Sequence, residues 1–291
     1  MVPTVVPDDR NQRIRRVLLA ILVANLLVVV IKFAVGLGTR SLAVFGDAMQ
    51  ASLDAVTNIL ALAIIGVAAK GPDAEHPYGH AKFETLGALL IVVFLSVSIF
   101  ELVRGAVARL VAGAPAPTAD GTDFLLLGIT LIVNIFVTVL ETRAGRRLDS
   151  GLLLADALHT RMDVAITLAV IGGLLLSGTG LGWADPLLAI LVAALVARAG
   201  YQIVRDALPT LVDERALDAR RIRDVAETIP GVESAYAIRS RAAARTRFAE
   251  LTIAVDGSAD VTSAHRIADA VEERLRARLE LHEVVVHVEP C

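Results

Sequence analysis

Six long apolar segments, separated by short polar or glycine-rich stretches, limit what this chain can fold into. Each segment is long enough to cross roughly 30 Å of hydrocarbon as a helix. They lie near residues 17–37, 42–69, 84–112, 122–142, 152–177 and 183–204. The chain is 55% hydrophobic and only 20% charged, with a mean hydropathy of +0.65, which is typical of a membrane protein with a soluble part. The sequence therefore predicts an α-helical membrane protein with six transmembrane helices.

The placement of lysine and arginine predicts how these segments are oriented. Basic residues precede the first segment and occupy the stretches between segments two and three and between four and five: Arg10, Arg13, Arg15, Arg16, Lys70, Lys82, Arg143, Arg146 and Arg147. Fewer basic residues, chiefly Arg40, lie on the opposite side. Cytoplasmic stretches carry the excess of basic residues, so both termini are expected in the cytoplasm. Residues 1–16 lack the cleavage site of a signal peptide, and the expected location is the cytoplasmic (inner) membrane.

After about residue 208 the sequence becomes charged and loses its long apolar runs. Its periodicity predicts a helix, two strands, a helix and a final strand, at residues 217–229, 234–241, 248–255, 260–279 and 283–289. This order predicts a small α+β domain of the ferredoxin-like αββαβ type. The expected division is an N-terminal segment over 1–16, a membrane domain over 17–208 and a soluble domain over 209–291.

Two motifs place polar side chains inside the apolar segments. His159 and Asp163 lie in the fifth segment, and Gln50 and Asp54 take the matching places in the second. A spacing of four residues puts both side chains of a motif on one helix face, one turn apart. Ionisable groups inside a bilayer are costly and usually mark an ion pathway, although any one of them can instead make a hydrogen bond between helices. Two such faces supply four ligands for one divalent cation.

A third cluster lies in the polar stretch between the second and third segments. Asp73, His76 and His80 stand close together in the run GPDAEHPYGH at residues 71–80. Imidazole and carboxylate are ligands that zinc takes in proteins. The alternative is a well-formed loop whose histidines cap the next helix or cover the mouth of the pore.

In this order, the six segments, the paired motifs, the His-Pro-Tyr-Gly-His loop and the α+β domain resemble the cation diffusion facilitator family of divalent-metal/proton antiporters, along nearly the whole chain. The resemblance implies a transport site made of Gln50, Asp54, His159 and Asp163. It also implies a second metal site at the loop positions, since some members bind metal there. The family usually has His or Asp where this chain has Gln50, whose amide offers an oxygen ligand but takes up no proton at ordinary pH.

By the same resemblance the soluble domain is a cytoplasmic dimerisation domain, and the protein is expected to be a homodimer. Many relatives bind regulatory metal in this domain through several histidines, but Tyr236 and Thr252 stand at two of those positions here. His265, His287 and Glu289 remain at matching places as doubtful metal ligands. The sequence therefore argues against a full binuclear site. The alternative is that these residues have ordinary packing roles.

The expected function is proton-coupled efflux of a divalent transition metal by alternating access. Zinc is the expected substrate because imidazole and carboxylate suit it, while iron(II), manganese, cobalt and cadmium stay open. A different class would be a sensor or scaffold that binds metal without moving it. An enzyme fits poorly, because the chain has no HExxH motif and no nucleophile with a general base at a recognisable spacing. No organic cofactor and no nucleic-acid partner are expected.

Overall fold

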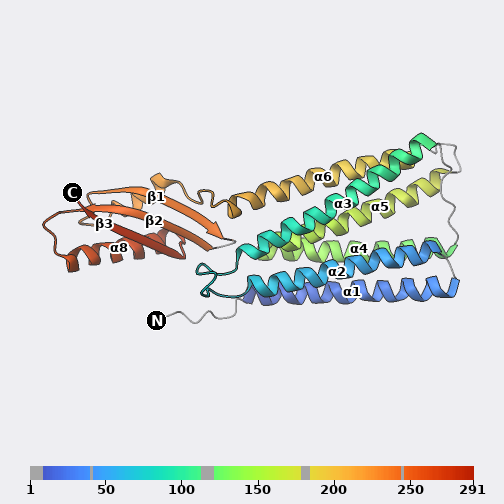
Figure 1. Ribbon diagram of the computed structural model, residues 1–291, viewed down its shortest axis with the longest axis horizontal. Helices are drawn as coiled ribbons and strands as arrows, with labels where there is room; N and C mark the ends of the chain where they lie inside the picture. The colour runs from blue at the N-terminus through green and yellow to red at the C-terminus, as the bar shows by residue number, and fades with distance from the viewer. Residues whose placement is uncertain (1–8, 40–41, 113–120, 178–183, 244–245) are drawn as a thin grey trace. The chain divides into compact units, whose positions relative to one another are not determined.

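The computed structural model describes residues 9–39, 42–112, 121–177, 184–243 and 246–291. The chain divides into two compact units, Met1–Ala207 and Leu208–Cys291. Six long helices account for the first unit: α1 (Asp9–Thr39), α2 (Leu42–Ala68), α3 (Lys82–Ala112), α4 (Gly121–Leu148), α5 (Gly151–Ser177) and α6 (Ala184–Leu211). Figure 1 shows these helices running along a common direction.

Four of these helices contain described stretches that are long and apolar enough to cross a membrane: Asp9–Ala34, Lys82–Ala112, Phe124–Leu148 and Pro186–Leu211. In α2 the described apolar stretch is shorter, and α5 carries three charged residues. Large apolar side chains such as Val23, Leu27 and Val30 are exposed along α1, as expected for a surface that faces lipid. The predicted helical membrane domain is confirmed.

The helix α1 begins earlier than the apolar pattern indicates. It starts at Asp9, whereas the first apolar segment starts near residue 17. Asp9 and Arg13 lie one turn apart and form an ion pair of 2.6 Å, which suits a polar first turn. Part of the predicted N-terminal segment is therefore helical.

The helices of the first unit meet in a core of aliphatic side chains. Ile14 and Leu18 of α1, Ile65 of α2, Ile91 of α3 and Leu152 of α5 are almost completely buried in it. Small residues let the helices approach one another, because an added Cβ at Gly87 of α3 would lie 2.5 Å from Ile64 Cγ2. This packing holds α2 and α5, which carry the two polar motifs, within one bundle.

The second unit is a three-stranded sheet with two helices. Its elements are α7 (Ala219–Ala226), β1 (Ser234–Ala243), β2 (Thr246–Val255), α8 (Val261–Leu279) and β3 (Glu283–Pro290). The strand order is β1-β2-β3, with β1 antiparallel and β3 parallel to β2. Figure 1 shows α8 along one face of this sheet, and Ile222, Ile253, Val271 and Leu275 are fully buried there. The predicted αββαβ fold is confirmed.

Gly231 lies in the turn between α7 and β1, where both the backbone conformation and the neighbouring atoms disfavour a side chain. Its φ is +96°, and an added Cβ would lie 2.7 Å from Ile267 Cδ1. We predict that Gly231→Ala destabilises the second unit by about 1–3 kcal/mol, through backbone strain and displacement of Ile267. Hydrogen exchange of the β1–β3 amides in the full chain measures the loss.

Gly257→Ala is the matched control for Gly231→Ala. An added Cβ at Gly257 makes only an ordinary contact of 3.5 Å with Pro290 Cβ. Its stability should change by less than about 0.5 kcal/mol. Equal exchange rates in the two variants would contradict the assignment of strain to Gly231.

Candidate metal centre

The structure brings three of the four predicted transport-site side chains together. His159 Nε2 lies 3.2 Å from Asp54 Oδ1 of α2 and 4.0 Å from Asp163 Oδ2, one turn along α5. One ligand atom from each residue falls within a group whose members are all within 4.8 Å of one another. One imidazole nitrogen therefore faces two carboxylates from two helices. Gln50 lies in α2, but its side chain falls outside the described residues.

The environment of this cluster suits reversible binding of a cation. His159 is 8% exposed, and Asp54 and Asp163 are half-buried, so the ligands are shielded without being sealed off. Two carboxylates and a neutral imidazole carry two negative charges, which balance a divalent cation. Carboxylate charges left together without a cation in a membrane domain are costly. The cluster therefore favours binding a cation or protons.

Lys32 of α1 is a further charged group near the cluster that the sequence analysis missed. It is 5% exposed, and its ammonium group is close enough to interact electrostatically with Asp163. A buried ammonium needs a counter-charge inside the membrane. The signal that could have found it was a charged residue within the apolar run of α1, where the only other polar residue is Asn25.

A chain of two hydrogen bonds, the second of them buried, lies one turn away from the cluster. Asn25 of α1 donates to Asn58 Oδ1 of α2 at 2.6 Å, and Asn58 donates to Asp156 Oδ2 of α5 at 3.2 Å. Asn58 follows Asp54 by one turn, and Asp156 precedes His159 by one turn. This bond holds α2 against α5 and so helps to set the separation of Asp54 and His159, which the two helices carry.

The loop between α2 and α3 forms the second three-residue cluster. Asp73 Oδ1 accepts hydrogen bonds from the backbone N–H of His76 at 2.7 Å and of Glu75 at 3.0 Å. These bonds, led by that of His76, and the charge of nearby His80 hold the pKa of Asp73 below its usual value. The Asp73 side chain therefore stays ionised and fixed in direction.

The two histidines of the loop point their nitrogens at this carboxylate. His80 Nε2 lies 3.4 Å from Asp73 Oδ2, and His76 Nδ1 lies 3.4 Å from Asp73 Oδ1. The other nitrogen of His80, Nδ1, is 3.1 Å from the carbonyl of Gly71. A hydrogen bond from Nδ1 to that carbonyl leaves the Nε2 lone pair free for a metal, as in many zinc sites. His76 Nδ1 is buried and lacks a hydrogen-bond partner among the described residues, which also suits a ligand.

Asp73→Asn is predicted to abolish metal binding by the loop and to leave metal binding by Asp54, His159 and Asp163 unchanged. The amide keeps the shape of the side chain but loses the charge that a divalent cation needs, so the affinity of the loop should fall at least about tenfold. Equilibrium dialysis of Zn²⁺ against the full chain should show one fewer tightly bound ion per subunit. Glu75→Gln is the matched control, because Glu75 is exposed in the same loop and lies outside the cluster. Unchanged Zn²⁺ stoichiometry in Asp73→Asn would rule out a loop site.

The predicted ligands of the second unit do not form such a cluster. His287 Nε2 is 3.4 Å from Glu289 Oε1 on β3, and Tyr236 donates a hydrogen bond to Glu289. His265 lies on α8 and pairs with Asp269 at 3.7 Å. Among the residues that the structure describes, the only groups of three or more potential ligands are the two in the first unit.

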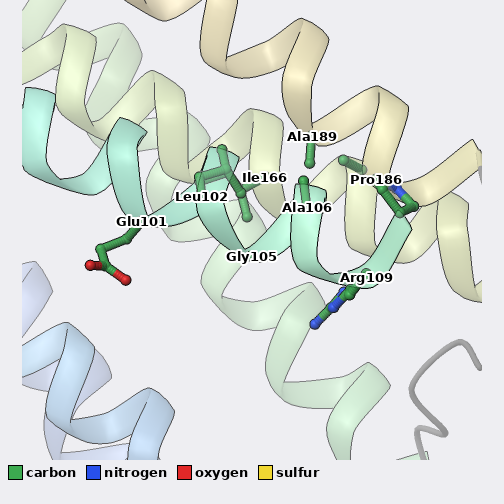
Figure 2. A pocket seen from close by; sticks show the side chains of 9 residues that line it. Glu101, Leu102, Gly105, Ala106, Arg109, Ile166, Pro186 and Ala189 are labelled. Atoms are coloured by element: carbon green, nitrogen blue, oxygen red, sulfur yellow. The ribbon is translucent and has the colours of Figure 1, made fainter. Parts of the chain in front are cut away.

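A pocket of about 290 Å³ lies apart from both clusters, between α3, α5 and α6 (Figure 2). Apolar side chains such as Leu102, Ala106 and Ile166 dominate its lining. Its charged residues are Glu101 and Arg109, and Glu101 pairs with Arg104 at 2.6 Å, as two oppositely charged residues three apart predict. The pocket therefore offers no ligand set for a cation.

Comparison with known protein families identifies the family to which this chain belongs. A sequence model of the cation efflux transmembrane domain matches residues 18–212, which is more than half of the chain. The chain belongs to the cation efflux, or cation diffusion facilitator, family. A model of the cytoplasmic domain of cation efflux proteins matches residues 215–291. The chain is therefore a multi-pass divalent-cation efflux transporter with a cytoplasmic C-terminal domain, and not an enzyme.

Individual relatives match this transporter along most of their length. The cation-efflux pump FieF of Shewanella oneidensis is 30% identical over 269 residues, covering 91% of this chain and 90% of that protein. FieF of Cronobacter sakazakii is 29% identical over 279 residues, covering 95% and 92%. The manganese efflux system protein MneP of Bacillus subtilis is 27% identical over 295 residues, covering 97% and 98%.

Proposed function

We propose that this transporter exports zinc in exchange for protons, through a site made of Gln50, Asp54, His159 and Asp163. The observation that carries the proposal is the convergence of Asp54 and Asp163 on His159 Nε2, at 3.2 and 4.0 Å. One imidazole and two carboxylates, with Gln50 proposed for the fourth position, match the ligands and coordination number of zinc. Two negative charges also balance one divalent cation.

Proton exchange follows from the chemistry of these ligands. A metal binds the deprotonated form of a carboxylate or imidazole, so metal binding and proton release are linked. In the proposed cycle the site takes a cation from the cytoplasm, reorients and releases it outside as protons return. Gln50 takes no part in proton exchange, because an amide is not protonated at ordinary pH. That leaves Asp54, His159 and Asp163 as the titratable ligands.

Other divalent metals are the alternative substrates. The amide oxygen of Gln50 is a harder ligand than the usual imidazole, which favours iron(II), manganese or cobalt more than a site of nitrogen ligands would. A relative is named for manganese efflux. Cadmium belongs in the same comparison, because ligand identity narrows the metal without selecting it.

The assembly proposed for this exporter is a homodimer in the cytoplasmic membrane, with both termini in the cytoplasm. Its proposed parts are residues 1–16, the membrane domain 17–208 and the dimerising domain 209–291. The family name of the matching cytoplasmic domain, ZT_dimer, supports dimerisation. Asp73, His76 and His80 would hold a second cation that loads or regulates the transporter, rather than one that crosses the membrane.

Metal flux in proteoliposomes with an imposed proton gradient tests the proposal. Zinc, iron(II), manganese, cobalt and cadmium are compared on the same preparation, with internal pH recorded alongside uptake. We expect proton-driven flux with zinc the fastest. A different fastest metal would replace zinc within the same mechanism. Binding without flux for every metal would instead favour a sensor or scaffold, and flux without pH change would defeat proton exchange.

A further inference from the structure

Two buried carboxyl groups in the membrane domain lie outside the metal cluster. Glu141 of α4 is 0% exposed and Asp156 of α5 is 1% exposed. Thr160 Oγ1 lies between them, 3.1 Å from Glu141 Oε2 and 3.3 Å from the backbone carbonyl of Asp156, and the two carboxyl groups are near enough to interact. Neither belongs to the group formed by Asp54, His159 and Asp163.

The hydrogen bonds around this pair leave room for one proton. Thr160 donates to Glu141 Oε2 at 3.1 Å, and Asn58 donates to Asp156 Oδ2 at 3.2 Å. Glu141 Oε1 receives no hydrogen bond from the described residues. Two ionised carboxylates only accept hydrogen bonds and repel each other, whereas a single proton between them makes one a donor to the other. A shared proton therefore supplies the donor that the pair lacks and halves the buried charge.

We propose that Glu141 and Asp156 hold one shared proton, as a proton-binding site separate from the metal ligands, and that a cation in the transport site expels this proton. The inference rests on the proposed exchange of metal for protons. It adds one proton-binding site to the three titratable ligands Asp54, His159 and Asp163. The fourth ligand position in this chain is Gln50, which binds no proton.

The charges that face the pair set the direction of this coupling. They come from the helices packed against it and are Asp54 of α2 and His159 and Asp163 of α5. Asp156 and His159 are three residues apart on α5 and so lie on neighbouring turns of one face. A cation bound at His159 adds positive charge beside the pair, which favours its ionised form and release of the proton. When the cation leaves, the repulsion between carboxylates returns and the proton rebinds.

Glu141→Gln tests this coupling, because the amide keeps the shape of the side chain and donates to Asp156 without a shared proton. Zn²⁺ binding to the full chain in detergent is followed by titration calorimetry in two buffers of different ionisation enthalpy. The comparison yields the number of protons released per Zn²⁺ bound. Asp73→Asn is present in all samples, so that the loop contributes equally. We expect Glu141→Gln to release about one proton fewer than the parent chain, and the logarithm of Zn²⁺ affinity to rise less steeply with pH.

Controls separate this inference from the proposed function. Glu101→Gln removes an exposed carboxylate and should release as many protons as the parent chain. If Glu141→Gln does not fold, Asp156→Asn decides, since it removes the same shared proton and should show the same loss. Equal proton release in the folded variant and the parent would overturn the shared site alone. A parent chain that binds Zn²⁺ without releasing any proton would instead overturn proton-coupled export.

Discussion

Replacing Asp54 by alanine is expected to reduce metal flux by at least about 100-fold. The substitution removes one of the two charges that balance a divalent cation, together with the carboxylate oxygen 3.2 Å from His159 Nε2. Loss of a residue that only orients a metal ligand already lowers affinity 10- to 100-fold, so loss of a ligand should cost at least as much. Asp163→Ala is expected to behave in the same way. Proteoliposome flux, measured with an imposed proton gradient, gives the result.

Glu101→Ala is the matched control for Asp54→Ala and Asp163→Ala. Glu101 is also a carboxylate on a membrane helix, but it is exposed and pairs with Arg104 instead of facing a histidine. Its removal should leave flux unchanged. Far-UV circular dichroism of each variant shows whether the helices remain, so that loss of flux is not mistaken for loss of fold. Normal flux in Asp54→Ala or Asp163→Ala would defeat the assignment of the transport site.

Spacing and the family resemblance together predicted the three side chains that the structure brings together, Asp54, His159 and Asp163. A four-residue interval fixes His159 and Asp163 on one face of a helix, and the second motif indicates which helix supplies the matching side chain. That the faces of α2 and α5 meet at His159 Nε2 is a property of the bundle. Helical periodicity assigns residues to a face, but it does not state which faces are neighbours. The transport site therefore remains a prediction from sequence that this geometry supports.

Lys32 and Glu141 show what the same reasoning could not supply. Lys32 lies outside the predicted motifs, and its relation to Asp163 arises only when α1 packs into the bundle. Glu141 lies close to the end of the fourth apolar segment, where a charged residue is usually taken to flank the membrane. Both are buried because neighbouring helices cover them, and the sequence does not say which helix covers a given charged residue.

The strands of the cytoplasmic domain illustrate a smaller difference. The prediction ended the first strand at residue 241 and began the second at 248, since the intervening run of alanine and arginine shows no alternation. In the structure the antiparallel ladder continues to the pair Ala243 and Thr246. Backbone hydrogen bonds between paired strands extend the hairpin whatever the side chains are. A prediction based on the strand propensity and alternation of side chains does not include these bonds.

Replacing Glu84 by alanine is expected to cost about 3 kcal/mol of stability, because it removes a buried carboxylate that a largely buried arginine contacts through both oxygens. Arg10 of α1 donates to both carboxylate oxygens of Glu84 at the start of α3, at 2.9 and 3.2 Å. Ser150 also donates to Glu84, at 2.5 Å. The other donors of Arg10 reach the carbonyls of Leu148 and Asp149 at 2.7 and 2.8 Å, which caps the end of α4. One ion pair thus ties together α1, α3 and the turn between α4 and α5.

Thermal unfolding in detergent, followed by circular dichroism, measures this loss. For a chain of this size about 1 kcal/mol shifts the midpoint by 2–4 °C, so Glu84→Ala should lower it by roughly 6–12 °C. A double-mutant cycle with Arg10→Ala isolates the pair, and we expect a coupling energy of about 1–3 kcal/mol. Glu101→Ala provides the contrast, because the exposed pair that it breaks should contribute less than about 1 kcal/mol. Additive effects of Arg10→Ala and Glu84→Ala would show that the two side chains act independently, and that the ends of α1 and α3 are held together by apolar packing alone.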